Sequence, residues 1–451
     1  MSYNAARLAD GRIRLVLSPE DRRAHSRVRY LKLVTPAPEI RSPAPVLAVT
    51  QKVEEKIMSA ENQVPNPALP VDNTMPMESS VDDLNLPDIP LPEDIKTETV
   101  VQDKFNSAVK FAFIGSGQSG GRLVSEFHNL GYNRVCAINT SIQDLNSIEL
   151  REDQKLCIGV GGAGKVRRVG EQQVKQRSEE AMSLMRRSFG TQFDRVIVIA
   201  SIGGGTGSGS FETLVRIANE LTESLRIKKV GEATRVGLML VLPSNSERDR
   251  MVNAVEAMKV AEQLLNQGVV SPLILVDNEQ ISKMYGSATI GNVFQKTNQS
   301  ITTLFHLFNI LADAPTKHLV FDAEEYRSIL ASGLIVYGAT PIKDVSKDGM
   351  TSAFRGNIGR NVLCGGMDIS TAKSVACLIV GEQGPLEAIP WDVIEHSYEM
   401  LGRVAGGATV HRGIYAAKRP LSAYTILGGL KLPKPRLDEI ARLAGKKDWD
   451  E

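Results

Sequence analysis

The chain has 451 residues, a formal net charge of +1, 42% hydrophobic residues and 23% charged residues. This length allows about two or three domains with hydrophobic cores, and the balanced charge gives no overall field that favours nucleic acid or a membrane. No apolar run approaches the roughly 18 residues of a membrane helix, and the four cysteines show no metal-binding spacing. We therefore expect a soluble, cytoplasmic protein.

Residues 1–107 are predicted to be a basic arm followed by a proline-rich, mostly disordered extension. The first 35 residues carry eight Arg or Lys side chains against three acidic ones. Such an arm either binds DNA or another acidic partner, or is a solvated extension. Eleven of the 21 prolines lie between Pro36 and Pro92, where acidic residues also gather. This composition buries too little apolar surface to offset the chain entropy lost on folding.

A second domain is predicted over residues 108–290, and its motifs follow in chain order. Residues 109–114 predict a strand, the glycine-rich residues 115–121 follow, and a helix is expected from Arg122. The GxGxxG pattern here is shared with dinucleotide-binding folds, which also need an acidic residue at the tip of the second strand. The second predicted strand, 135–138, ends instead in Asn139 and Thr140. A dinucleotide-binding oxidoreductase is therefore a distant alternative.

The next glycine-rich segment, residues 157–166, reads Cys-Ile-Gly-Val-Gly-Gly-Ala-Gly-Lys-Val. It is close to the P-loop pattern Gly-x4-Gly-Lys. Val166 occupies the position at which a Ser or Thr hydroxyl would bind Mg²⁺, which argues against a P-loop NTPase. A helix is expected after this segment, over residues 171–185.

The chain is organised around residues 203–209, with the sequence Gly-Gly-Gly-Thr-Gly-Ser-Gly. Residues 195–200 before it predict a buried strand, and the pattern from Phe211 predicts a helix. A glycine-rich turn between strand and helix lets backbone N–H groups approach an anion, at which the helix dipole points. A Gly/Ser linker is the alternative, but linkers are rarely placed between a buried strand and a helix. We predict phosphate binding.

Residues 203–209 match the phosphate-loop signature of the tubulin/FtsZ superfamily at every position, and the chain resembles that superfamily over about residues 108–430. The resemblance implies a GTPase whose GTP-binding domain, residues 108–290, binds GTP or GDP with Mg²⁺. It also implies that a polar side chain of the second loop, residues 139–141 with 143–145, meets Mg²⁺ or phosphate, and we assign no particular side chain as a metal ligand. The implied nucleotide contacts in the glycine-rich loops and the second loop are Gly117, Gln118, Ser119, Gly120, Asn139, Gly161, Gly162, Ala163, Gly164, Gly203, Gly204, Gly205, Thr206, Gly207, Ser208 and Gly209.

The resemblance continues on the ribose and base side of the nucleotide. After the predicted strand 236–242, it implies that Glu247 contacts the ribose and that Arg250, one residue from the FtsZ spacing, lies near the phosphates. The alternative is a solvated, charged helix start. After the strand 272–277, Asn278 matches an Asn that contacts guanine in FtsZ.

A long central helix is predicted over residues 291–315, with one buried stripe formed by Ile301, Leu304, Phe305, Phe308 and Leu311. Near its start, Phe294 would stack on a purine or, alternatively, belong to the core. Asn298 takes a position that is Asn in tubulin and Asp in FtsZ, where it would hydrogen-bond the guanine edge.

The predicted fold is α/β. Five strands that end in polar or glycine-rich loops, with helices between them, predict a Rossmann-like parallel sheet with its ligand at the carboxyl ends of the strands. Four later strands, at 333–339, 375–380, 408–415 and 424–429, predict a smaller mixed sheet covered by a helix at 391–401. This part resembles the family's activation domain, over residues 316–430, and residues 431–451 form a basic tail.

Asp322 and Glu325 match the two catalytic carboxylates of the family motif Asn-x-Asp-x-x-Asp/Glu, and Val320 takes the place of the Asn. The resemblance implies that they orient water against the terminal phosphate; the alternative is that they cap a helix. If Asn298 contacts the base, a helix rising about 1.5 Å per residue from there to residue 312 has ends roughly 20 Å apart. Asp322, beyond the far end, then lies well out of hydrogen-bond range of its own nucleotide. The pair then reaches only the nucleotide of a second molecule stacked head to tail, and that contact repeats into a filament.

The sequence therefore predicts a polymerisation-activated GTPase whose main partner is itself. The cellular hypothesis is a filament that moves or positions plasmid or phage DNA through a DNA-bound adaptor. Two alternatives are an FtsZ-like cell-division protein and a non-polymerising nucleotide-binding structural module.

Overall fold

The computed structural model describes residues 3–7, 13–17, 30–31, 101–227, 234–284, 290–360 and 362–451, and the side chains of residues 101–227, 234–284, 297–356, 358 and 362–451. In the first three ranges, β1 (Tyr3–Arg7), β2 (Ile13–Leu17) and β3 (Tyr30–Leu31) pair antiparallel in that order. The side chains of the basic arm and the predicted disorder of the proline-rich extension lie outside the described residues.

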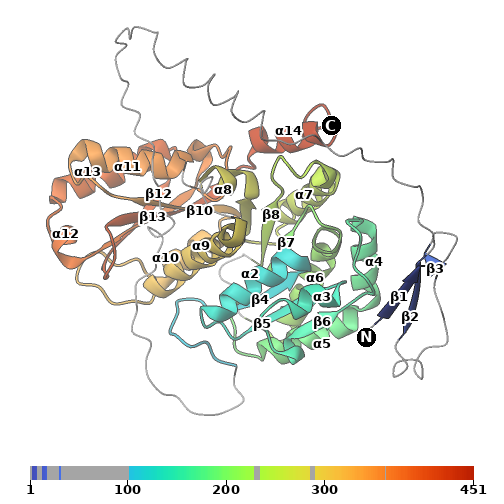
Figure 1. Ribbon diagram of the computed structural model, residues 1–451. Helices are drawn as coiled ribbons and strands as arrows, with labels where there is room; N and C mark the ends of the chain where they lie inside the picture. The colour runs from blue at the N-terminus through green and yellow to red at the C-terminus, as the bar shows by residue number, and fades with distance from the viewer. Residues whose placement is uncertain are drawn as a thin grey trace, which may run out of the picture. The chain divides into compact units, whose positions relative to one another are not determined.

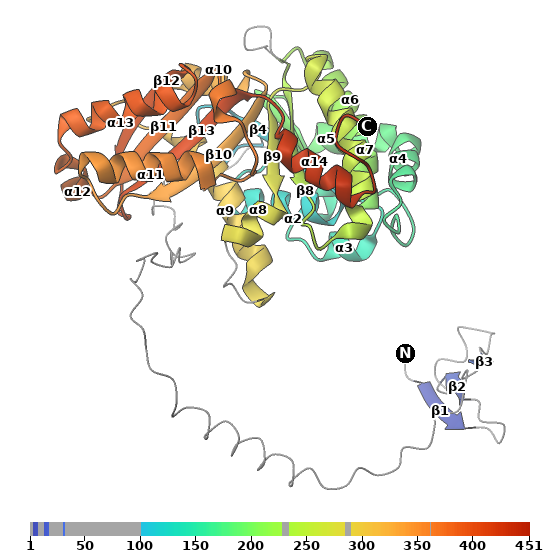
Figure 2. The same ribbon diagram turned by 90° about the horizontal axis from the view of Figure 1, so that it is seen from above.

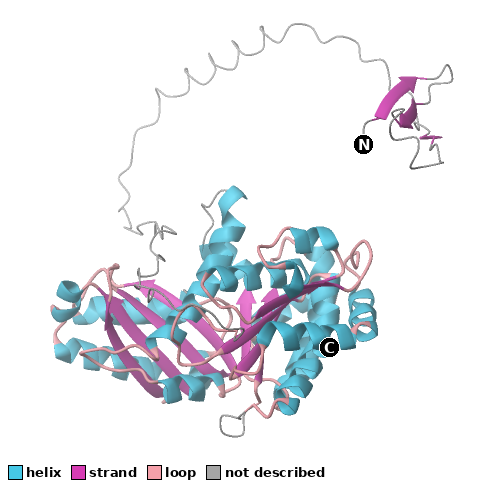
Figure 3. Cartoon of the chain, turned by 90° about the horizontal axis from the view of Figure 1, so that it is seen from below, coloured by secondary structure: helices cyan, strands magenta, loops and turns pink. Residues whose placement is uncertain are grey.

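The N-terminal half of the main domain contains a parallel sheet. Its strands are β4 (Phe111–Ser116), β5 (Val135–Asn139), β6 (Lys155–Cys157), β7 (Arg195–Ser201), β8 (Val236–Leu242) and β9 (Leu273–Asp277). They lie in the order β6-β5-β4-β7-β8-β9, and every neighbouring pair is parallel. Helices cover both faces (Figure 3), which explains why these strands are continuous apolar runs instead of alternating ones. The predicted parallel sheet is confirmed.

The helices between these strands are α2 (Gly117–Asn129), α3 (Ile142–Asn146), α4 (Arg167–Gln176), α5 (Ser178–Phe189), α6 (Gly205–Ser224), α7 (Met251–Asn266) and α8 (Asn278–Met284). The single helix expected at 171–185 is two helices, because the backbone of Arg177 leaves the helical region between them. Both α2 and α6 begin inside their glycine motifs, not at Arg122 and Phe211 as expected.

The C-terminal half adds β10 (Leu334–Pro341), β11 (Ser374–Gly381), β12 (Thr409–Ala416) and β13 (Ser422–Leu430), with α10 (Ala323–Leu330), α11 (Lys347–Arg360), α12 (Gln383–Glu387) and α13 (Trp391–Val404). These strands form the expected mixed arrangement, but not a separate sheet. Leu334 and Ile335 of β10 pair in parallel with β9, so the described strands of both halves form one ten-stranded sheet (Figure 1).

The long helix α9 (Ile290–Leu311) packs against α2 and β10. All five residues of the predicted apolar stripe are buried. Phe305 of that stripe lies with its ring 4.7 Å from the ring of Phe111 at the start of β4. The predicted stripe is therefore confirmed. No helix among the described residues has the length and apolar character that crossing a membrane requires.

Residues 101–107 also pack onto this domain, so the packed chain extends beyond the expected start at residue 108. Asp103 and Arg134 form a buried ion pair at 2.7 Å, and the ring of Phe105 lies 4.6 Å from the ring of His306. The Nδ1 atom of His306 lies 3.2 Å from the hydroxyl of Tyr132. His306 is therefore enclosed where α9 meets this N-terminal segment.

The enclosure of His306 predicts a dependence of stability on pH. Burial lowers the pKa of His306 from 6.5 to about 4, so between these values the unfolded chain binds a proton that the folded protein excludes. The stability from neutral His306 is complete above about pH 6.5 and is lost as pH falls, by up to about 1.4 kcal/mol per pH unit. The free energy of unfolding, measured with urea at about pH 7, 6 and 5, should fall less steeply with falling pH for His306→Gln than for the wild type. Equal slopes would contradict this role.

Candidate functional site

The loops that follow β4, β5, β7 and β8 meet at one edge of the sheet. Gly117 directly follows β4 and lies against α6, since a Cβ atom on it would be 3.1 Å from the backbone N of Gly207. The hydroxyls of Thr140 and Thr206 are 2.7 Å apart. The backbone N of Gly162 donates to the carbonyl of Thr140 at 3.0 Å. The structure thus brings together the three glycine-rich loops and the second loop.

The loop containing Gly161, Gly162 and Gly164 has an open backbone. These glycines have φ angles of +79°, +89° and +54°, in the left-handed region that favours glycine. A Cβ atom on Gly161 or Gly164 would meet nothing within 4 Å, and the side chain of Val160 is 97% exposed. Ala163 is buried and faces Gly205. Successive backbone N–H groups in such turns form concave anion-binding sites.

Most glycines of the 203–209 motif, unlike those of the open loop, allow close packing of backbones. Cβ atoms on Gly207 and Gly209 would lie 2.5 Å from the carbonyl of Ser201 and 2.1 Å from that of Arg167. A Cβ atom on Gly170 of α4 would lie 2.4 Å from the carbonyl of Gly205. The backbones of α4 and α6 are therefore in direct contact at Gly170, Gly205 and Gly209, while Gly207 packs against the end of β7. Gly204, in contrast, has no atom within 4 Å of its Cβ position.

Two helix N-termini point into this edge without a capping side chain. Neither Ser116, the N-cap of α2, nor Gly204, the N-cap of α6, makes a side-chain cap hydrogen bond, and neither first turn contains an acidic residue. The first turns include Gln118 and Ser119 in α2, and Thr206 and Ser208 in α6. Uncapped N–H groups and the positive end of the helix dipole favour an anion at this place.

Asp144 links two of the predicted site residues. It accepts hydrogen bonds from Gln118 Nε2 at 3.0 Å and from Asn139 Nδ2 at 3.2 Å. Asn139 is buried at the end of β5, and its Oδ1 accepts from the backbone N of Ser141 at 3.2 Å. Asp144 is not among the predicted nucleotide contacts, although it lies in the second loop that the resemblance implies.

The segment after β8 closes the site from a further side. Glu247 pairs with Arg250 at 2.7 Å, and a Cβ atom on Gly203 would lie 3.0 Å from the Cβ of Arg250. Asn253 Nδ2, at the start of α7, donates to the carbonyls of Lys165 at 2.7 Å and Gly203 at 3.2 Å. Asn253 therefore joins the open loop to the glycine motif. It has no motif signal, and sequence reasoning missed it.

The structure describes the predicted base-contacting residues only in part. Asn278 follows β9 directly, so its α8 start lies at the same edge of the sheet as the glycine loops. Asn298 is half-buried on α9, and its carbonyl accepts a hydrogen bond from Thr302 at 3.0 Å. The side chain of Phe294 lies outside the described residues.

Asp322 and Glu325 form a capping box at the start of α10. Asp322 Oδ1 accepts from the backbone N of Glu325 at 2.8 Å, and Glu325 Oε2 accepts from the backbone N of Asp322 at 3.0 Å. Glu325 Oε1 lies 3.0 Å from Nδ1 of His411 on β12. Because a carboxylate only accepts, Nδ1 of His411 carries the proton. The helix-cap alternative therefore describes a real interaction, while the side chain of Asp322 stays exposed.

The position of α10 separates this carboxylate pair from the glycine loops. Arg327 of α10 donates from Nη2 to the carbonyl of Ala108 at 2.6 Å, and the ring of Tyr326 lies 6.5 Å from that of Phe111. Both partners lie at the start of β4, whereas Gly117 follows its end. A strand rises about 3.3 Å per residue, so roughly 20 Å separates Phe111, at the start of β4, from Gly117. The pair and the glycine edge therefore lie at opposite ends of the sheet.

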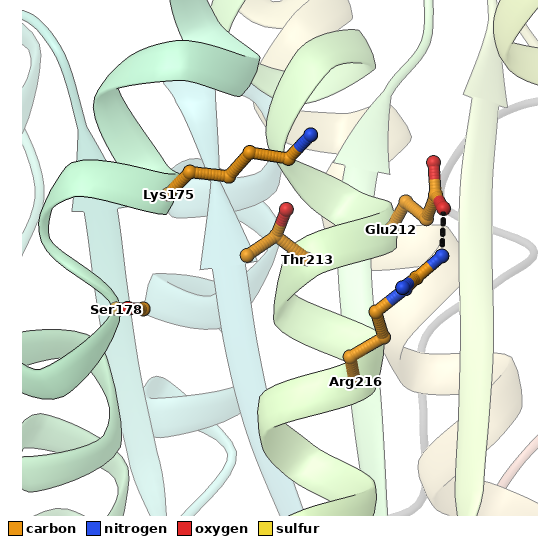
Figure 4. Close-up of a pocket in the computed structure, with 5 residues that line it drawn as sticks. All are labelled: Lys175, Ser178, Glu212, Thr213 and Arg216. Atoms are coloured by element: carbon orange, nitrogen blue, oxygen red, sulfur yellow. Dashed lines mark hydrogen bonds and ion pairs between the residues drawn. The ribbon is translucent and has the colours of Figure 1, made fainter.

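A separate hollow of about 240 Å³ lies on the surface beside α6 (Figure 4). It is lined by Lys175, Ser178, Glu212, Thr213 and Arg216. The ion pair between Glu212 and Arg216, at 2.6 Å, spans one side of it. No predicted site residue lines this hollow, which lies along α6 beyond the glycine motif.

A parallel sheet with uncapped helix N-termini and an open glycine loop at its carboxyl edge defines a phosphate-binding α/β protein. Within that class, residues 110–286 match the model of the Tubulin/FtsZ family, GTPase domain. The chain is 29% identical over 199 residues to Cell division protein FtsZ 2 of Haloferax volcanii, and the match covers 43% of this chain and 44% of that protein. It is 23% identical over 354 residues to Cell division protein FtsZ of Haloferax mediterranei, covering 74% and 86%.

Solved structures show the same fold. The GTPγS-form protofilament of TubZ from Bacillus thuringiensis serovar israelensis matches with a TM-score of 0.66 and 15% identity, over 77% of this chain and 94% of that one. The GTPγS-bound protofilament of CetZ2 from Haloferax volcanii matches with a TM-score of 0.59 and 21% identity, over 74% and 98%. The sequence match to the Tubulin/FtsZ family thus covers the GTPase domain, residues 110–286, and the likeness of fold extends over 74–77% of the chain.

The packed and the open glycines of residues 203–209 predict different effects of an added methyl group on stability. Gly209→Ala places a Cβ atom against the carbonyl of Arg167, and such overpacking should lower the free energy of unfolding by about 1–3 kcal/mol. Gly204→Ala enters open space with φ at −81° and should change stability by less than about 0.5 kcal/mol. Thermal and urea unfolding of the two variants measure this difference. Equal stability would contradict the packing assignment.

Proposed function

We propose that this protein binds and hydrolyses GTP, assembles head to tail, and completes each active site with residues from the next molecule. The observation that carries the proposal is the separation of the glycine edge from Asp322 and Glu325 by the length of the parallel strands. The GTPase-domain match over residues 110–286 supports the choice of nucleotide. The TubZ and CetZ2 structures named above are GTPγS-form or GTPγS-bound protofilaments, which supports the choice of assembly.

The residues at the glycine edge fit a nucleoside triphosphate. The N-termini of α2 and α6, together with the open loop at Gly161 and Gly164, offer backbone N–H groups to the phosphates. Glu247 and Asn278 follow neighbouring strands and would contact the ribose and the base. Mg²⁺, when bound with the nucleotide, neutralises phosphate charge, and Asp144 supplies a carboxylate at this edge.

Hydrolysis then depends on positioning a water molecule against the terminal phosphate. Asp322 is exposed, and its Oδ1 is held by the backbone N of Glu325, so the carboxylate is fixed in direction without being covered. Glu325 is engaged by the backbone N of Asp322 and by His411. We assign the direct contact with water to Asp322 and the alignment of α10 to Glu325.

The distribution of exposed apolar side chains supports an association of the two edges. Among the described residues, the large exposed hydrophobic side chains are Ile142, Val160, Val166, Val252, Val320 and Trp391. Four of these six lie in or beside the glycine-edge loops, and Val320 lies two residues before Asp322. Head-to-tail stacking would cover both groups, which are costly to leave in water.

The cellular role is a cytoplasmic filament that moves or positions plasmid or phage DNA through a DNA-bound adaptor. The relatives named cell division proteins favour a second role, as an FtsZ-like division protein. Filaments that gather in a ring at mid-cell would favour the division role over DNA movement.

A charge in the open loop tests nucleotide binding. Gly164→Asp adds a carboxylate where a Cβ atom meets nothing, at a φ of +54° that Asp tolerates, so the fold should persist while the charge repels phosphate. GTP affinity, measured by equilibrium dialysis, should fall at least about tenfold. The control Gly164→Asn has the same shape without the charge and should bind GTP within about threefold of the wild type. Equal affinity of both variants would contradict a phosphate site here.

A mixing experiment tests the shared active site. Asp322→Ala should form filaments that sediment with GTP and not with GDP, but should hydrolyse GTP at least about a hundredfold more slowly than the wild type. Gly164→Asp alone should also be inactive, because it binds little GTP. Equal amounts of both variants should regain activity, since the GTP on an Asp322→Ala molecule meets Asp322 of its Gly164→Asp neighbour. No gain on mixing would refute the shared site.

A further inference from the structure

The C-terminal segment is packed against the nucleotide-binding half of the domain. The sequence predicts a basic tail over residues 431–451, and the structure places α14 (Lys434–Leu443) within it. Views from the front and from above show α14 beside α7 and near the end of β8 (Figures 1 and 2). Trp449, beyond α14, is 6% exposed, and Lys259 of α7 lies over its ring at 5.7 Å.

Arg436 of α14 is the centre of this contact. Its guanidinium is buried and binds Asp277 through two hydrogen bonds, of 2.9 Å from Nε and 3.0 Å from Nη2. Asp277 is the last residue of β9, and Asn278 follows it. Two parallel hydrogen bonds fix the direction of both partners, so Arg436 orients the chain at the point where α8 begins.

The same side chain also holds the loop after β8. Arg436 Nη2 donates to the carbonyl of Pro243 at 2.7 Å, and Nη1 donates to Asn245 Oδ1 at 2.6 Å. Glu439, one turn along α14, accepts from Asn245 Nδ2 at 2.7 Å. The amide of Asn245 is therefore held from both sides by α14. This loop leads directly to Glu247.

We propose that Arg436 is a positioning residue for the nucleotide site. Through it, the segment 434–449 clamps the loops that carry Glu247 and Asn278 in the arrangement that binds ribose and base. This proposal rests on the proposed function, since it assumes that these loops hold a nucleotide. Because coupling between two binding events is reciprocal, bound nucleotide must in turn strengthen the docking of α14.

The chain contains an internal probe of this docking. It has two tryptophans, and Trp391 is 58% exposed while Trp449 is buried. Trp391→Phe therefore leaves Trp449 as the only tryptophan, in the full-length protein. Its emission should shift to longer wavelength when the segment leaves α7 and water reaches the ring.

The experiment compares Arg436→Met with Arg442→Met in this Trp391→Phe background. Arg442 is on the same helix, but its Nε donates to the backbone carbonyl of Asp438 within α14 itself, at 3.2 Å. Arg436→Met should lower GDP affinity by at least about tenfold and shift the Trp449 emission to longer wavelength, and saturating GDP should reverse part of that shift. Arg442→Met should match the Trp391→Phe parent in both measurements. Equal GDP affinity of the two Arg variants would overturn the clamp.

A double variant separates positioning from general stability. Arg436→Met leaves Asp277 buried without its partner, which is destabilising in itself. Adding Asp277→Asn removes that charge and should recover much of the thermal stability, while GDP affinity stays low because the loops remain unclamped. Recovery of both properties together would overturn the proposal. Absence of GDP binding in the Trp391→Phe parent would overturn the proposed function and this proposal with it.

Discussion

The common direction of β4, β5, β7, β8 and β9 is the constraint on which the rest of the structure depends. Since these strands are parallel, their carboxyl ends and the loops after them share one edge, and their starts share the opposite edge. The helices that follow β4 and β7 direct uncapped N-termini toward the first edge. The helix α10 is fixed at the other edge by Arg327 and Tyr326. The sheet therefore keeps the two halves of the proposed active site apart.

The glycines at residues 203–209 meet two structural requirements, close packing of backbones and exposure of backbone groups. Gly205 and Gly209 allow the backbones of α4 and α6 to touch, which brings α4 and the open loop before it against the start of α6. Gly204 and the loop around Gly162 leave backbone groups uncovered. Both requirements call for a missing side chain, but only the second creates space for a ligand.

The sequence was sufficient for the features that depend on local pattern. Apolar runs such as residues 236–242 predicted the buried strands, and the spacing of Ile301 to Leu311 predicted the buried face of α9. Helix starts were placed too late, because glycines at 117–121 and 205–209 have low helix propensity and only their tertiary packing makes them helical. The join between β9 and β10 was also missed, because pairing between distant strands leaves no local signal.

The site residues also divide into those that a local sequence motif identifies and those that only distant contacts define. Glycine motifs identified the loops that the structure brings together. Asn253, Asp144 and Arg436 were not assigned, since each acts through contacts with segments far away or on another element. Arg436 lies in the segment predicted as a basic tail. The burial of Arg436 depends on its partner Asp277, which lies more than 150 residues earlier in the chain.

The central claim is that one molecule alone does not contain a complete active site. Steady-state GTP turnover per molecule, measured over a range of protein concentrations, tests it most directly. We expect almost no turnover below a threshold concentration and a constant rate per additional molecule above it. The same turnover per molecule at every concentration would show that a single chain completes its own chemistry, and would contradict the account.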